Sequence, residues 1–345
     1  MRQEINGWDD LKTKIPDEYF VNTVDRRRDR RPEVCIVVLR EVVDPVLARS
    51  SDPERAELFI TKDSKDKEIV RARINGEKFT SVERLTGLNL CRVLNQNKGE
   101  TWDIISPQYL YNEITGGLAV GINPDTVTYG AASVEQRATF AIKSRVIEGY
   151  TYTLEPYNLL KKEQHNALYE TGTMIKVGAE EESGEERGRG LYAHVNIEPP
   201  TKMIHFVRIE APTKGMFLYV LHNILNTTSY FARGTRKGNI RNKIIGVIFS
   251  KTSIGLSSGE MIKEQLSADV KSDYKLSEVL ESVKRYTTTH KNSFWKILWR
   301  DEKEFEELIV PAINVALLTT ENSKDILRDC LKELVAQARA SYTPQ

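Results

Sequence analysis

Two short apolar runs that lie far apart in the chain constrain the fold more than any other feature. They are VCIVVL at 34–39 and IIGVIFS at 244–250. Runs of this length that are rich in β-branched residues and lack polar alternation are typical of strands buried on both faces. We therefore expect both runs to be central strands of a sheet.

The rest of the sequence alternates between strand and helix patterns. Further strands are predicted at 69–74, 138–153, 191–197 and 202–210, and helices at 80–95, 215–226 and 321–340. Their order fits an α+β fold with a modified core of the ferredoxin-like or RNA-recognition-motif (RRM) kind. We expect a single domain over residues 1–345 with large insertions, the first of them a helical and strand segment at about 48–110.

Two further segments are predicted to lie outside this core. Residues 115–134 are rich in glycine and small side chains, which favours an extended loop or a long hairpin. Residues 178–190 hold five glutamates and four glycines without apolar periodicity. That composition predicts a mobile, acidic surface loop without a role in binding.

Charge is strongly segregated along the chain, although 50 basic and 49 acidic residues leave a net charge of only +1. Residues 211–259 contain seven lysines and arginines and no acid. A stretch of that length would hold about seven acids by composition alone. A polyanionic partner explains this segregation.

A glycine-punctuated basic loop forms the centre of the acid-free stretch. Its glycines allow a close backbone approach, and its cations and backbone N–H groups can hold successive phosphates. Tyr230 offers a face on which a base could stack. The phosphate-binding candidates are Arg233, Arg236, Lys237, Arg241 and Lys243. The alternative is an ordinary solvated turn.

Two other basic groups are weaker candidates for nucleic-acid contact. Arg28 belongs to the run DRRRDRR at 25–31, whose own aspartates could neutralise it. Lys143 and Arg145 fall on one face of the strand predicted at 138–153.

Signals for catalysis, metal binding and membrane insertion are missing from the sequence. Phosphate-binding-loop, serine-hydrolase and zinc-protease motifs are absent. The three cysteines and five histidines do not cluster at ligand spacing, so we expect no metal and no cofactor, and reduced, buried thiols. With no apolar stretch long enough to span a membrane, we expect a cytoplasmic, non-catalytic protein.

Three stretches of the chain resemble a known family. They are residues 206–260, from FVRIEAPTKG through TSYFARGTRKGNIRNKIIGVIFS to SSGE, with RPEVCIVVLREV at 31–42 and YNEITGGLAVGINPDTVTYG to SRVIEGYTY at 111–152. Together they resemble the Cas-seven-type backbone subunit of type I-D CRISPR Cascade complexes, and the resemblance extends over most of the chain.

The resemblance implies a function and a set of partners. It implies an RRM-like subunit that oligomerises along a CRISPR guide RNA and presents the spacer for pairing with target DNA. Its partners would then be the guide RNA, target DNA, copies of itself and other Cascade subunits, with no membrane. The same resemblance makes the glycine-rich segment at about 111–145 a lid or thumb hairpin and the basic loop a phosphate grip.

Two alternatives stay open at this stage. One is a ferredoxin-fold endoribonuclease that processes CRISPR RNA with His165 or His205 as general base. The other is an RNA-binding module unrelated to CRISPR. Repeat-RNA cleavage would favour the first, and genomic neighbours would decide the second.

Overall fold

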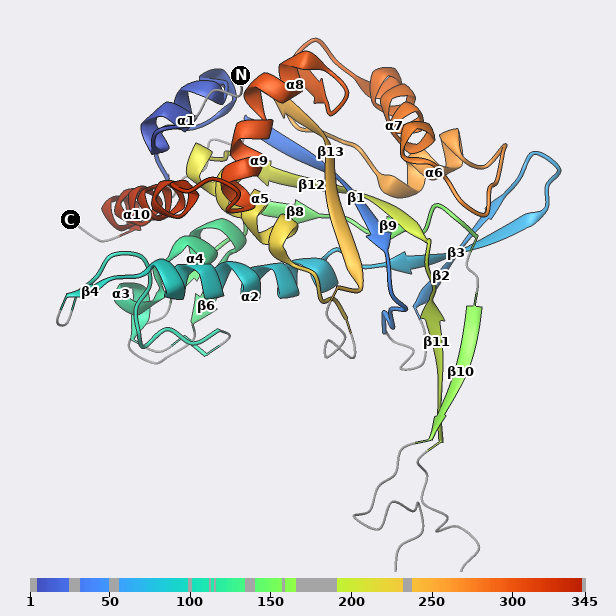
Figure 1. Ribbon diagram of the computed structural model, residues 1–345, viewed down its shortest axis with the longest axis horizontal. Coiled ribbons are helices and arrows are strands. Elements are labelled where there is room, and N and C mark those ends of the chain that lie inside the picture. Colours follow the sequence, from blue (N-terminus) through green and yellow to red (C-terminus); the bar gives the residue numbers. More distant parts are fainter. Residues whose placement is uncertain are drawn as a thin grey trace, which may run out of the picture.

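A five-stranded antiparallel sheet forms the centre of the molecule (Figure 1), in the order β14-β13-β1-β12-β8. The computed structural model describes residues 5–24, 32–49, 56–98, 101–111, 113–114, 116–133, 140–156, 159–165, 191–231 and 238–342. The strands are β1 (Glu33–Val42), β8 (Val146–Glu148), β12 (Lys202–Glu210), β13 (Ile240–Ser250) and β14 (Trp295–Trp299). The two apolar runs are thus neighbouring inner strands, as expected.

The connections confirm the predicted α+β fold. Helix α2 (Glu77–Leu94) follows β1, and helix α5 (Lys214–Asn226) joins β12 to β13. In the sheet order, the connection from β1 through α2 to β8 passes over β12, and the connection from β12 through α5 to β13 passes over β1. This is the split βαβ arrangement. Helix α2 is therefore part of the core. The insertion predicted at about 48–110 had included this helix. The added part is the hairpin of β2 (Glu57–Lys62) and β3 (Glu68–Ile74), which β9 (Thr151–Tyr152) extends.

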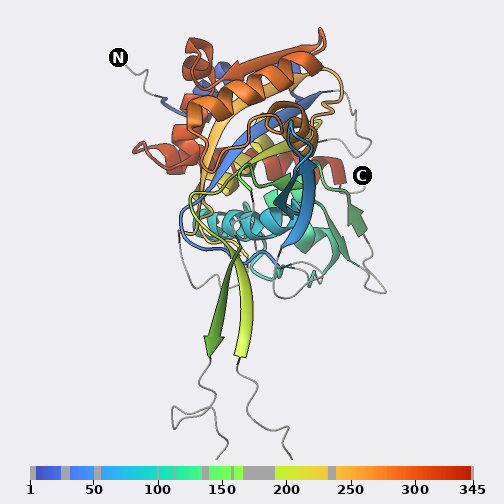
Figure 2. The same ribbon diagram turned by 90° about the vertical axis from the view of Figure 1, so that its right-hand side faces the viewer.

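Both faces of the central sheet are covered by helices (Figures 1 and 2). Val34, Ile36 and Val38 pack in one core with α5, α9 (Val310–Ala316) and α10 (Ser323–Tyr342). Cys35, Val37 and Leu39, which point the other way, pack with α6 (Ser258–Gln265) and α7 (Leu276–His290). A large ligand can therefore reach β1 only at its ends.

The prediction of an extended segment at 115–134 was wrong. This stretch contains two short helices, α3 (Gly117–Gly121) and α4 (Pro124–Tyr129). The Asn123 side chain caps α4 in a capping box with Thr126, Pro124 occupies the first turn, and Gly130 ends the helix at φ 81°. These are standard helix boundary signals, and they outweigh the glycine content.

The long strand predicted at 138–153 is broken into three short ones. Its pieces are β7 (Phe140–Ile142), which pairs with β6 (Ala131–Ser133), then β8 and β9. The alternation was real, but bends at 143–145 and 149–150 place the pieces in different sheets.

A two-stranded ribbon projects away from the body of the molecule (Figures 1 and 2). It consists of β10 (Leu159–His165) and β11 (Leu191–Ile197). The acidic stretch 178–190 lies outside the described residues. The smaller elements are α1 (Trp8–Lys14), the 3-10 helix Asp17–Tyr19, β4 (Asn97–Lys98), β5 (Thr101–Trp102) and α8 (Lys303–Leu308).

The cysteines agree with the expectation of reduced, buried thiols. All three cysteines are free and buried. Of the helices in the described ranges, none has the length and apolarity that a membrane span needs.

Candidate nucleic-acid interface

The stem of the basic loop is held together by paired hydrogen bonds. The described chain stops at Phe231, after α5, and resumes at Gly238, just before β13. On the two sides of this gap, the Tyr230 N–H donates to Asn239 Oδ1 (3.0 Å), and Asn239 Nδ2 donates to the Tyr230 carbonyl (2.9 Å). The Val43 N–H donates to the Asn239 carbonyl (3.0 Å), which ties the stem to the end of β1. Arg233, Arg236 and Lys237 lie between these anchors, outside the described residues.

A buried polar cluster lies directly under this stem. We call it the stem network: Arg40 of β1, Glu83 of α2, and Tyr230 and Asn242 on the two sides of the loop. Arg40 Nη1 donates to Glu83 Oε1 (2.7 Å), Asn242 Oδ1 (3.1 Å) and the Tyr230 hydroxyl (3.2 Å). The Tyr230 hydroxyl in turn donates to Glu83 Oε1 (2.9 Å). The network joins three core elements to the base of the loop.

Burial makes the electrostatics of the stem network strong. The side chains of Arg40 and Glu83 have no exposed surface. Burial by itself would lower the pKa of Arg40, but the Glu83 carboxylate raises it overall, so the guanidinium stays charged. It also lies over the Phe79 ring, 4.2 Å from the centroid. A buried ion pair of this kind fixes geometry, because removing either partner leaves an uncompensated charge.

The end of β13 carries two of the predicted phosphate-binding residues. Arg241 is exposed, next to the loop stem. Lys243 is half-buried and forms an ion pair with Glu41 of β1, at 2.9 Å. Arg241 is thus placed to meet an anion directly, whereas Lys243 is already partly neutralised.

A basic cavity lies beside the first turn of α2. It has a volume of about 220 Å³, and we call it the Arg73 cavity. Its charged lining is Arg49, Arg73 and Lys78 against a single carboxylate, Glu57, which pairs with Arg73 at 2.6 Å. The guanidinium of Arg73 lies 4.9 Å from the ring centroid of Tyr150, which is 45% exposed. The cavity therefore combines surplus positive charge with an accessible aromatic ring.

The Arg73 cavity and the loop stem meet on the first turns of α2. Phe79 packs edge-on against Phe231 at the loop stem, with ring centroids 4.9 Å apart. The preceding residue, Lys78, lines the cavity. The sequence pointed to the basic loop but not to this second group, because Arg49, Arg73 and Lys78 come from three separate elements.

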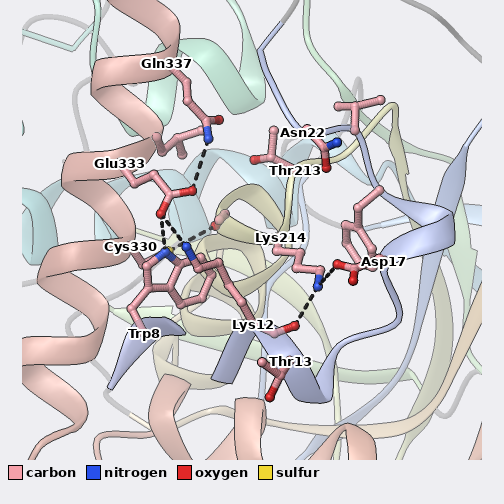
Figure 3. A pocket seen from close by; sticks show the side chains of 14 residues that line it. Trp8, Lys12, Thr13, Asp17, Asn22, Thr213, Lys214, Cys330, Glu333 and Gln337 are labelled. Carbon is pink, nitrogen blue, oxygen red and sulfur yellow. Dashed lines mark hydrogen bonds and ion pairs between the residues drawn. The ribbon is translucent and has the colours of Figure 1, made fainter. Parts of the chain in front are cut away.

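A second cavity, of about 270 Å³, lies between α1, α5 and α10 (Figure 3), at the far end of α5 from the basic loop. Lys12 Nζ contacts Glu333 Oε2 at 2.9 Å, and Trp8 Nε1 donates to the same oxygen. Lys214 pairs with Asp17. Because both lysines face carboxylates, this cavity offers no surplus positive charge to a polyanion.

Several predicted site residues lie elsewhere than the sequence suggested. Tyr230 is only 1% exposed, so the predicted stacking face is wrong: the ring is packed against Phe79 and its hydroxyl is used in the stem network. Arg145 is also buried, and its Nη1 donates to the Ala211 carbonyl at 2.7 Å, which supports the turn before α5. Lys143 is exposed in the segment between β7 and β8, whereas Arg145 is buried. Arg28 lies outside the described residues.

The candidate general bases differ in how they are placed. His205 is 1% exposed, and its Nδ1 accepts a hydrogen bond from Arg40 Nε at 3.1 Å. Burial, and then the charge of Arg40, hold the pKa of His205 well below its ordinary value of 6.5. A neutral, enclosed imidazole supports the sheet and has no room for a substrate. His165 belongs to β10, and its side chain lies outside the described part.

Comparisons with known proteins bear on the fold. The crystal structure of Thermofilum pendens Csc2 is similar over 95% of this chain and 96% of that one, with 16% identity and a TM-score of 0.56. A chain of a type IV-B CRISPR complex shares 15% identity over 65% of this chain and 93% of its own, with a TM-score of 0.39. A chain of a CRISPR RNA-guided surveillance complex shares 9% identity over 82% and 99%, with a TM-score of 0.47.

Comparison of the sequence with protein-family models and curated proteins identifies the family of the chain. No curated protein matches the chain. The family model described as Csc2 Crispr, however, matches residues 35–325, from the first central strand to the start of α10. That span contains the whole split βαβ core, the stem network and the Arg73 cavity. The chain belongs to the Csc2 CRISPR family.

Proposed function

We propose that this chain is a guide-RNA-binding backbone subunit of a type I-D Cascade complex, which assembles with copies of itself and other Cascade subunits along the RNA and presents it to target DNA. The observation that carries the proposal is the family match over residues 35–325. The protein acts without catalysis, in the cytoplasm.

The described residues support a specific place for the RNA backbone. The stem network pins a loop with three cations, Arg241 is exposed beside it, and the Arg73 cavity adds three further cations around α2. Phosphate contacts from such groups do not depend on base sequence. A subunit that must hold any spacer sequence requires this kind of contact.

A cleavage assay tests the proposal against the endoribonuclease alternative. The purified full chain is incubated with repeat-containing RNA and with unrelated single-stranded RNA in EDTA. We expect both RNAs to be bound with similar affinity and to remain intact. Specific cleavage of the repeat RNA, lost in His165→Ala, would overturn the non-catalytic assignment.

A further inference from the structure

Helices α6 and α7, which cover the second face of the sheet, bring three potential metal ligands together. Glu260 and Glu264 lie four residues apart on α6, and Tyr286 and His290 lie four residues apart on α7. Residues four apart lie one turn from each other on the same helix face. Each helix therefore presents a pair of polar side chains to the other.

The spacing of the three ligand atoms fits one ion. One carboxylate oxygen each from Glu260 and Glu264 and a ring nitrogen of His290 all lie within 4.8 Å of one another. His290 Nε2 is 3.2 Å from Glu264 Oε1. Two ligands of a tetrahedral Zn²⁺ ion, with bonds of roughly 2.0–2.2 Å, are about 3.4 Å apart. His290 and Glu264 are thus at ligand spacing, and the Glu260 carboxylate lies within 4.8 Å of both.

A buried tyrosine supports two of the three ligands. The Tyr286 hydroxyl accepts a hydrogen bond from the Ser257 N–H (3.0 Å) and donates one to Glu260 Oε2 (2.6 Å). Its ring lies against the imidazole of His290, with centroids 4.7 Å apart. Tyr286 has no exposed surface. Outer residues that orient ligands in this way are characteristic of metal sites.

The local charge favours a cation. Within the ranges that the structure describes, neither Glu260 nor Glu264 forms an ion pair with a lysine or arginine. The nearby Arg285 is directed to Glu281 and Gln265 instead. Two carboxylates with one histidine between them therefore leave surplus negative charge, which a divalent ion would neutralise.

We propose that Glu260, Glu264 and His290 bind a divalent transition-metal ion, preferentially Zn²⁺, which ties α6 to α7 over the sheet. The imidazole ligand favours such an ion over Mg²⁺ or Ca²⁺, which prefer oxygen ligands alone. Water fills the remaining coordination positions. The expectation of no metal site considered cysteine and histidine clusters only, and here two of three ligands are carboxylates from a different helix.

The test adds only Zn²⁺ to the chelator-treated full chain. Because RNA takes no part in it, a negative result would contradict the metal site and leave the proposed function unaffected. We expect calorimetry to show Zn²⁺ binding and thermal unfolding to shift upward. His290→Ala and Glu264→Gln should each weaken this binding at least tenfold, and Tyr286→Phe roughly tenfold. All three cysteines are buried and cannot replace these ligands in the folded chain.

The control is Glu281→Gln, which removes an exposed carboxylate from the same helix without touching the three ligands. It should bind Zn²⁺ as tightly as the wild type. The proposal is overturned if the wild type shows no binding at 100-fold molar excess of Zn²⁺, or if His290→Ala and Glu264→Gln bind with wild-type affinity. An equal thermal shift with Mg²⁺ would overturn the assignment to a transition metal.

Discussion

Replacing Glu83 by alanine should destabilise the protein far more than removing a surface carboxylate. In the wild type, Glu83 Oε1 is 2.7 Å from Arg40 Nη1, and neither side chain is exposed. After Glu83→Ala, the hydrogen-bond partners that remain for the buried guanidinium are neutral groups, with Asn242 Oδ1 and His205 Nδ1 both at 3.1 Å. An uncompensated buried charge of this kind costs about 3–5 kcal/mol of unfolding free energy.

A matched surface pair provides the scale for this loss. Arg285 and Glu281 on α7 are 3.4 Å apart, with side chains 57% and 70% exposed. Such a pair contributes about 0.3–0.5 kcal/mol, so Glu281→Ala should have a barely measurable effect. Equilibrium urea unfolding of the wild type and both variants, followed by circular dichroism, measures the difference. A loss below about 1 kcal/mol for Glu83→Ala would refute the account of the stem network.

Two further predictions follow from the neighbourhood of the loop stem. Burial, and then the charge of Glu83, raise the pKa of Glu148 from 4.5 to about 8, so the folded state holds a proton that the unfolded state releases. Stability should therefore fall as the pH rises from 4.5 to 8, and Glu148→Gln should flatten this fall in pH-dependent urea unfolding; an unchanged slope would contradict it. In the Arg73 cavity, Arg49→Ala and Lys78→Ala should each weaken single-stranded RNA binding for all sequences and reduce the salt slope by about 0.7. Filter binding at several salt concentrations checks this, and wild-type slopes would exclude the cavity from the RNA path.

The local elements were largely predictable from the sequence. The apolar runs of β1 and β13 and the apolar stripe of α5 encode burial directly, since their patterns match the periods of strand and helix. The same holds for the position of the basic loop between α5 and β13, which follows from its sequence neighbours. Helix α4 was missed because the prediction for 115–134 gave the glycines more weight than the capping signal of Asn123.

The contacts of the site were not predictable, because they join distant parts of the chain. Tyr230 seemed suited to stack on a base, but its hydroxyl partners, Glu83 and Arg40, are 147 and 190 residues away in sequence. Likewise, Arg145 looked exposed on an alternating strand, but its partner Ala211 is 66 residues away. Short-range periodicity carries no information on such pairings.

The salt dependence of RNA binding by Arg233→Ala, Arg236→Ala and Lys237→Ala combined tests the central claim most directly. Each lost phosphate contact on a single strand should reduce the slope of log K against log salt by about 0.7. We therefore expect the triple variant to bind all single-stranded RNAs more weakly, with a slope smaller by about 2, and to unfold like the wild type. A wild-type slope in the folded triple variant would show that the basic loop does not hold the RNA.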